Sequence, residues 1–288
     1  MNHFLFQKKL LPQGHHQKLN KALTMLMNKA ALILFSTLSC SAYAGGLSER
    51  GDAQVGKNFS TEELITFSKK IERSLAAKGA HVAIVSRIGR PEKELPPNIQ
   101  YTHVAFWVYS KIKTSDGREI PGYQVYNLYQ RAGSIDTSEL VNDYPPDFFS
   151  GVDSLNAGII IPKPSLQNKI LDVITSDTYK RLHVKKYSVV ANPFDDEYQN
   201  CTEFTLDVLT SAIYNTNDYQ QIKANIKAYF KPQEINLGTM KTLLGPLFVK
   251  DFTTRDQNSP IVTATFTTIA NFMNEYQLSD ATYHLVKD

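Results

Sequence analysis

Three consecutive stretches in the first half of the chain are rich in apolar, β-branched and aromatic residues, a pattern that predicts β-strands. They span residues 80–88, 102–109 and 123–129. Asp116 and Gly117 are turn-forming residues between the second and third stretches, so these two strands are expected to pair in antiparallel fashion. Two shorter apolar runs, at residues 157–161 and 187–191, predict further strands.

Apolar residues recur at helical spacing after Asn200, which predicts a helix that begins at Cys201. Asn200 is a favourable N-cap residue, and Glu203 stands where a capping-box carboxylate would bond back to the amide of the cap. Ser165 is similarly placed to cap a helix that runs to residue 174. Cys201 is therefore expected on the first turn of its helix.

Beyond Asn215 the pattern changes to three helical stretches joined by polar segments that contain proline. The stretches are residues 219–230, 236–248 and 261–276, although the β-branched run 263–268 is also compatible with a strand. About 70 residues form a small core on their own. We therefore expect an α+β domain over residues 45–214 and a helical C-terminal extension over residues 215–288 that packs on it.

The first 44 residues have the pattern of a signal peptide. Met27, Asn28 and Lys29 precede an apolar run at residues 30–38, and small residues at 42–44 predict cleavage after Ala44. A membrane anchor is disfavoured, because the run is shorter than the roughly 20 residues that a spanning helix needs. A lipid-modified Cys40 is a weaker alternative, and the start codon is Met1 or Met27. We expect an exported, periplasmic protein with no transmembrane anchor after processing.

The composition excludes several classes of function. The chain has 288 residues, of which 42% are hydrophobic and 20% charged, as in globular proteins. Its net charge of +3 arises from the predicted signal segment, because the remaining chain has 26 basic and 28 acidic residues. This remaining chain has no basic stripe, so nucleic acid is not an expected partner. No zinc pattern or phosphate-binding glycine loop is present. The acidic residues Asp195, Asp196 and Glu197 favour a charged turn over a cation site, so no metal and no cofactor are expected.

Cys201 is the only cysteine after residue 44, and a single cysteine cannot close an intramolecular disulfide. It is an inert buried residue, an intermolecular bridge or a reactive thiol. The start of a helix favours the thiolate, which is the nucleophilic form. A general base would complete a nucleophilic site.

His103 opens one predicted strand, and Asn127 lies on the next. If the strand register brings them together, the amide of Asn127 can orient the imidazole, as in a Cys-His-Asn arrangement with Cys201. Each is also an ordinary residue of a strand when taken singly. His81 opens another predicted strand and is the alternative base, but the strand that follows it offers no comparable orienting residue.

The order of a strand-starting histidine and a later helix-starting cysteine resembles the circularly permuted, NlpC-type branch of the papain-like cysteine hydrolases. Residues 79–131 and 186–214 carry the resemblance, through His103-Val104-Ala105 at the start of a strand and Asn200 to Phe204 at the start of a helix. It is strongest to an exported bacterial family, domain of unknown function family 2145. The resemblance implies an α+β fold, with an antiparallel papain-like sheet and a cysteine-bearing helix. It also implies Cys201 as nucleophile, His103 as general base and Asn127 as orienting residue.

Members of that superfamily act on peptide or isopeptide bonds of the cell wall and on lipid esters and amides. The resemblance therefore implies an exported cysteine hydrolase or acyltransferase whose partner is a cell-envelope peptide, lipid or amide. Arg87, Gly89 and Arg90 are candidates to bind an anionic group of the substrate, and residues 142–149 are candidates for a cleft wall. The alternative is an envelope protein that keeps the fold for binding without catalysis. The sequence leaves open whether the protein is an enzyme, its substrate and its oligomeric state.

Overall fold

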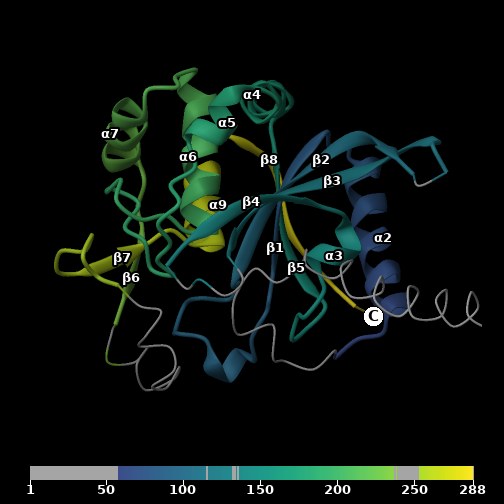
Figure 1. Ribbon diagram of the computed structural model, residues 1–288, viewed down its shortest axis with the longest axis horizontal. Helices are drawn as coiled ribbons and strands as arrows, with labels where there is room; N and C mark the ends of the chain where they lie inside the picture. The colour runs from purple at the N-terminus through teal and green to yellow at the C-terminus, as the bar shows by residue number, and fades with distance from the viewer. Residues whose placement is uncertain are drawn as a thin grey trace, which may run out of the picture. The chain divides into compact units, whose positions relative to one another are not determined.

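The computed structural model describes residues 58–114, 116–131, 134, 136–236, 238 and 253–287. Six strands of this part of the chain form one antiparallel sheet in the order β4-β3-β2-β1-β5-β8 (Figure 1). They are β1 (Val82–Arg87), β2 (His103–Lys113), β3 (Glu119–Gln130), β4 (Ser138–Asp143), β5 (Asn156–Pro162) and β8 (Ser279–Val286). The predicted α+β class with an antiparallel sheet is confirmed.

The hairpin of β2 and β3 forms as the turn residues predicted. The two strands pair from Lys113 opposite Glu119 to Phe106 opposite Tyr126. Gly117 has a φ of +83°, a left-handed conformation that glycine adopts without a steric penalty. This hairpin brings His103 and Asn127 into neighbouring strands.

Helices cover both faces of the sheet (Figure 1). The helices α2 (Thr61–Ala77) and α3 (Pro145–Phe148) lie on one side. The other side carries α4 (Pro164–Thr175), α5 (Asp177–Arg181), α6 (Cys201–Tyr214), α7 (Tyr219–Tyr229) and α9 (Phe266–Glu275). Successive side chains of a strand point to opposite faces, so the sheet separates two apolar cores. On β2, Val104 and Phe106 belong to the α6 core, whereas Ala105 and Trp107 belong to the α2 core.

The C-terminal part differs from the helical extension expected over residues 215–288. The helix α7 matches its predicted stretch, but residues 261–276 divide into the strand β7 (Ile261–Thr263) and α9. The strand β7 pairs with β6 (Gln233–Ile235) in a small sheet. Most of the predicted helix at 236–248 lies outside the described residues.

The strand β8 was not predicted, and it joins the central sheet by pairing with β5. Its apolar residues Ala281, Tyr283 and Leu285 alternate with polar ones and pack against the α2 core. The expectation of a purely helical extension is therefore wrong, because this segment has the two-residue period of a half-buried strand. The C-terminal residues complete the sheet of the domain that they were expected to cover.

Two further predictions need correction. Residues 187–191 form no strand, and Tyr187 makes only an isolated bridge to Gln199. The segment 142–149 does not line the Cys201 pocket; Phe148 and Phe149 are fully buried in the α2 core, whereas Tyr144 is exposed. Aromatic side chains gain more from burial than from exposure at a cleft.

None of the described helices is long and apolar enough to cross a bilayer. The predicted signal segment, residues 1–44 with Cys40 and the cleavage site after Ala44, lies outside the described residues.

Candidate functional site

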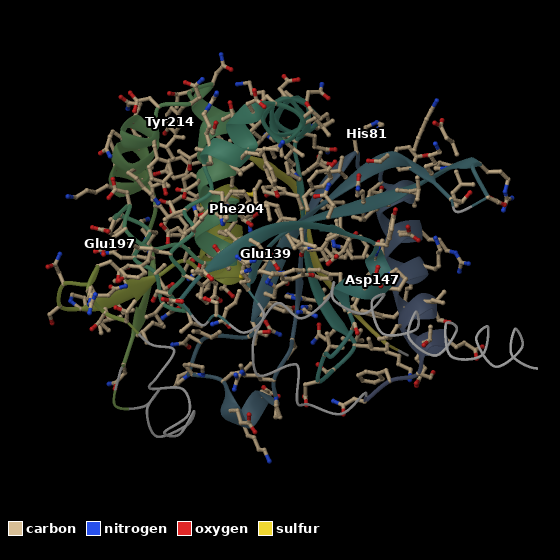
Figure 2. All side chains as sticks on the ribbon, in the orientation of Figure 1. His81, Glu139, Asp147, Glu197, Phe204 and Tyr214 are labelled. Carbon is tan, nitrogen blue, oxygen red and sulfur yellow. The ribbon has the colours of Figure 1, made fainter. Side chains whose placement is uncertain are left out.

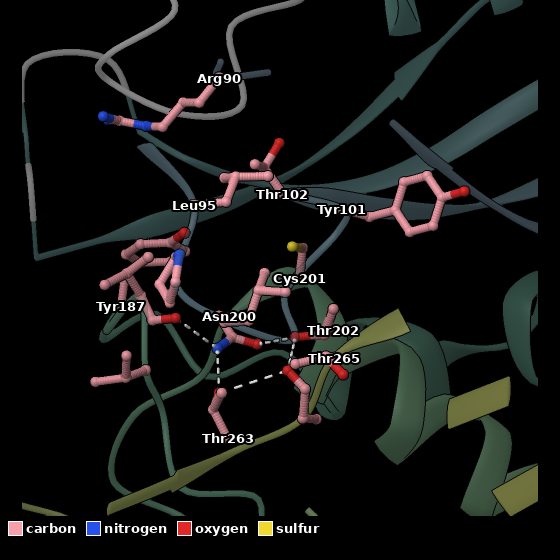
Figure 3. A pocket seen from close by; sticks show the side chains of 15 residues that line it. Arg90, Leu95, Tyr101, Thr102, Tyr187, Asn200, Cys201, Thr202, Thr263 and Thr265 are labelled. Atoms are coloured by element: carbon pink, nitrogen blue, oxygen red, sulfur yellow. Dashed lines mark hydrogen bonds between the residues drawn. The ribbon is translucent and has the colours of Figure 1, made fainter. Parts of the chain in front are cut away.

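Cys201 lies on the first turn of α6, as predicted, and lines a pocket of about 90 Å³ (Figure 3). The wall of the pocket is mainly apolar and comes from the segments before β2 and before α6: Leu95, Pro96, Ile99, Tyr101, Tyr187, Val189 and Val190. Figure 3 shows the sulfur of Cys201 on the side that faces Leu95 and Thr102, whereas the hydroxyl of Tyr101 points away from it. The thiol thus lies at the wall of the pocket, although Cys201 itself is only 6% exposed.

Asn200 fixes the first turn of α6. Its Oδ1 accepts a hydrogen bond from the amide of Glu203 at 2.9 Å, which confirms the predicted N-cap. Its Nδ2 donates to the carbonyl of Val189 at 3.1 Å and to Oγ1 of Thr263 at 3.3 Å. Thr202 Oγ1 lies 2.7 Å from the carbonyl oxygen of Ala264. The turn that carries the thiol is thus held from two sides.

The C-terminal segment 263–265 also lines the pocket, which the sequence did not reveal. This segment runs from the last residue of β7, Thr263, to the N-cap of α9, Thr265. Its β-branched run signalled a strand, but no local pattern links it to a cysteine about 60 residues earlier in the chain. Such contacts arise from tertiary packing.

His103 and Asn127 are brought together, because Nε2 of His103 lies 3.0 Å from Oδ1 of Asn127. The amide group of Asn127 donates through Nδ2 to Oδ2 of Asp143 at 3.1 Å, so its Oδ1 is the acceptor. The bond therefore assigns the proton to Nε2 of a neutral His103 and leaves Nδ1 as an acceptor. Tyr129 also donates to Oδ2 of Asp143, at 2.5 Å.

The surroundings of His103 disfavour its charged form. Its ring lies 4.9 Å from the ring of Tyr129 and 5.6 Å from that of Phe148, and the residue is only 2% exposed. Burial and the charge of Arg87 hold the pKa of His103 well below 6.5, although the bond to Asn127 opposes this shift. Arg87 faces His103 across the β1–β2 pair.

The structure does not bring the His103 ring to the thiol. Cys201 packs in the core beneath α6, whereas His103 contacts Phe148, which belongs to the core beneath α2 and α3. Figure 2 shows the two sides through the labels of Phe204 on α6 and Asp147 on α3. His103 and Asn127 therefore form a buried polar pair on the other face of the sheet from Cys201.

The structure also shows where the alternative base, His81, and the candidate anion-binding residue Arg87 lie. His81 precedes β1 at the end of the sheet opposite to Arg87 and packs its ring 6.0 Å from that of Tyr109. The strand β1 has six residues, so His81 and Arg87 lie roughly 20 Å apart along it, at about 3.3 Å per residue. Arg87 is fully buried and donates to the carbonyls of Phe148 and Ser150, so it is part of the protein interior.

Arg90 lines the Cys201 pocket. The acidic turn has contacts of its own: Asp195 accepts the amide of Glu197, and Glu197 pairs with Lys186 at 3.0 Å. The described residues contain no cluster of three or more His, Cys, Asp or Glu side chains that is able to hold a metal ion.

Residues 74–273 match a family model described as an uncharacterized protein conserved in bacteria, DUF2145. No curated protein and no solved structure matched the chain. The match covers well over half of the chain and includes β1 to β5, α6, the Cys201 pocket and the His103–Asn127 pair. The chain therefore belongs to this bacterial family.

Proposed function

We propose that this protein is an exported, periplasmic cysteine hydrolase or acyltransferase that uses Cys201 on an amide or ester substrate, and that its fold is a permuted papain-like one. The observation that carries the proposal is the position of Cys201 on the first turn of α6, at the wall of a pocket. The positive end of the helix favours the thiolate there. The arrangement supplies a nucleophile together with a place for its substrate.

The chemistry follows from these groups. The thiolate of Cys201 attacks the carbonyl carbon, the developing oxyanion lies near the amides of the first turn, and the bond to the leaving nitrogen or oxygen breaks. The leaving group takes up a proton, and the acyl group on sulfur passes to water or to another acceptor. The apolar wall of the pocket suits the carbon skeleton of such a substrate, and Arg90 suits an anionic group on it.

In this proposal His103 is the base and Asn127 its orienting residue, but their 3.0 Å bond holds the imidazole on the other face of the sheet from Cys201. Proton transfer between Cys201 and His103 then requires the imidazole to leave its contacts with Tyr129 and Phe148. The burial of His103 on the other face favours a second candidate function, in which the Cys201 pocket binds an envelope ligand without turnover. In that function the His103–Asn127 pair only stabilises the fold.

An acyl-transfer assay separates the two functions. We would incubate the full chain with nitrophenyl esters of short acyl chains, follow nitrophenolate release, and search by mass spectrometry for an acyl group on the Cys201 peptide. The hydrolase proposal predicts release and an acyl adduct that both disappear in Cys201→Ser and persist in the control Cys40→Ser. Release that is the same in Cys201→Ser, with no adduct, contradicts it and supports binding alone.

The variant His103→Gln tests the base separately. A loss of 100-fold or more in turnover, with a native circular dichroism spectrum, is the effect of removing a general base. Unchanged turnover shows that the thiol works without His103.

A further inference from the structure

A buried ion network lies beneath the first two turns of α6. Nζ of Lys223, on the neighbouring helix α7, lies 2.7 Å from Oε1 of Glu203 and 2.9 Å from Oδ1 of Asp207. The lysine side chain is 6% exposed and both carboxylates are fully buried. Gln199 and Tyr219 donate to Oδ2 of Asp207 at 2.8 and 3.1 Å.

We propose that Lys223 is a positioning residue for Cys201: its ammonium offsets the two carboxylates of α6 and thereby keeps the first turn favourable for a thiolate. This inference rests on the proposed nucleophilic role of Cys201. Glu203 is only two residues from Cys201 and Asp207 is six residues away on the same helix. These separations correspond to about 3 and 9 Å of rise along the helix axis, at about 1.5 Å per residue, and over such lengths an uncompensated carboxylate opposes a second negative charge.

Glu203 is engaged by this network and not by the helix cap. The sequence predicted that its carboxylate would bond back to the amide of Asn200, but the carboxylate pairs with Lys223 instead. The prediction of a capping box is therefore wrong, because a buried ammonium is a stronger partner for a carboxylate than a backbone amide. The start of α6 is therefore capped by the side chain of Asn200, without the reciprocal bond from Glu203.

The charges in the network support an offsetting role for Lys223. Burial lowers the pKa of Lys223, but the carboxylates of Asp207 and Glu203 outweigh it and hold this pKa above the usual value. Burial raises the pKa values of Glu203 and Asp207, and the ammonium of Lys223 opposes the rise. Lys223 therefore stays charged at neutral pH.

Further charged groups lie around the network and the pocket. Asp256 raises the pKa of Glu203, and Asp196 raises that of Tyr219. On the pocket side, Arg90 lines the wall together with Cys201. Lys223 lies within hydrogen-bond distance of both α6 carboxylates.

A purely structural network is the competing explanation. Buried ion pairs are often no more stabilising than apolar residues of the same size. Removal of one partner destabilises the fold in either case, so stability alone does not decide. The ionisation of the Cys201 thiol does, because a structural role leaves it unchanged.

The test is the pH profile of Cys201 alkylation by iodoacetamide in the full chain, with peptide mass spectrometry to separate Cys201 from Cys40. We expect Lys223→Met to move the midpoint upward by about one pH unit, close to a ten-fold lower rate at pH 7. A second substitution, Glu203→Gln, should restore the midpoint, because it removes one of the charges that Lys223 offset. Lys231→Met removes an exposed lysine that pairs with Glu275 and is the matched control, with no shift expected.

Glu203→Gln alone keeps the test decisive if Lys223→Met does not fold. Its expected shift is downward, since Lys223 then faces one carboxylate fewer. An unchanged midpoint in folded Glu203→Gln, or an equal shift in Lys231→Met, overturns the inference. If the wild-type thiol itself titrates like a free cysteine, the proposed nucleophilic role of Cys201 fails. If the wild-type midpoint is lowered but these substitutions do not move it, only the role of Lys223 fails.

Discussion

Replacing Asn127 by alanine should destabilise the fold, although an orienting residue at a cleft would be expected to affect catalysis alone. Asn127 is fully buried and bonds both Nε2 of His103 and Oδ2 of Asp143. Its removal leaves two buried polar groups with one partner fewer each. At about 1–3 kcal/mol for each unsatisfied group, we expect a loss of about 2–6 kcal/mol in the free energy of unfolding.

Urea denaturation followed by circular dichroism measures this loss directly. A chain of this size should also show a lower melting temperature, by about 2–4 °C per kcal/mol. The matched control is Asn225→Ala, since Asn225 accepts a single bond from Gln221 on the exposed side of α7 and should change stability by less than about 0.5 kcal/mol. A loss in Asn127→Ala as small as that of the control would refute the buried His103–Asn127–Asp143 chain.

Three further predictions concern pH, packing and processing. The pKa of His103 in the folded chain lies well below 6.5, so below pH 6.5 the unfolded chain binds a proton on this residue that the folded chain does not. The free energy of unfolding is therefore unaffected by His103 above pH 6.5. Below that pH it should fall by about 1.4 kcal/mol per pH unit, relative to His103→Gln. Equal slopes for both proteins in urea titrations at pH 6.5 and 5.5 would rule this out. Gly158→Ala should cost about 1–3 kcal/mol, because a Cβ there would lie 2.5 Å from a ring carbon of Phe266 and 2.6 Å from Oγ of Ser86; an unchanged urea midpoint would show that this contact relaxes freely. Protein recovered from the periplasm should begin at Gly45 by intact mass, and a mass that retains residues 27–44 or a lipid on Cys40 would contradict the predicted cleavage.

The sequence was sufficient for elements whose signals are local. The pairing of β2 with β3 followed from Asp116 and Gly117, and the start of α6 followed from the Asn200 cap. The strand β8 also carried a local signal, since Ala281, Tyr283 and Leu285 alternate with polar residues, but it was assigned to a helical extension. That error came from extending the character of the preceding helices through the end of the chain.

The arrangement of the site was harder to predict for a physical reason. Alternation along a strand shows which residues share a face, but not which helix covers that face. His103 and Asn127 were correctly expected to be neighbours, whereas Cys201 packs against the opposite face of the same sheet. The partner of Glu203 was equally hidden, because Lys223 is 20 residues away and reaches it only after α7 folds back on α6.

The measurement that tests the central claim most directly is the alkylation rate of Cys201 as a function of pH in the native full chain, compared with the same chain unfolded in guanidinium chloride. If Cys201 is a nucleophile at a pocket, the native thiol should react faster than the unfolded one at pH 7, with a midpoint below about 8.5, the value of an unperturbed cysteine. A native thiol that reacts more slowly than the unfolded one, with a midpoint at or above about 8.5, would show an inert buried cysteine and contradict the proposed chemistry.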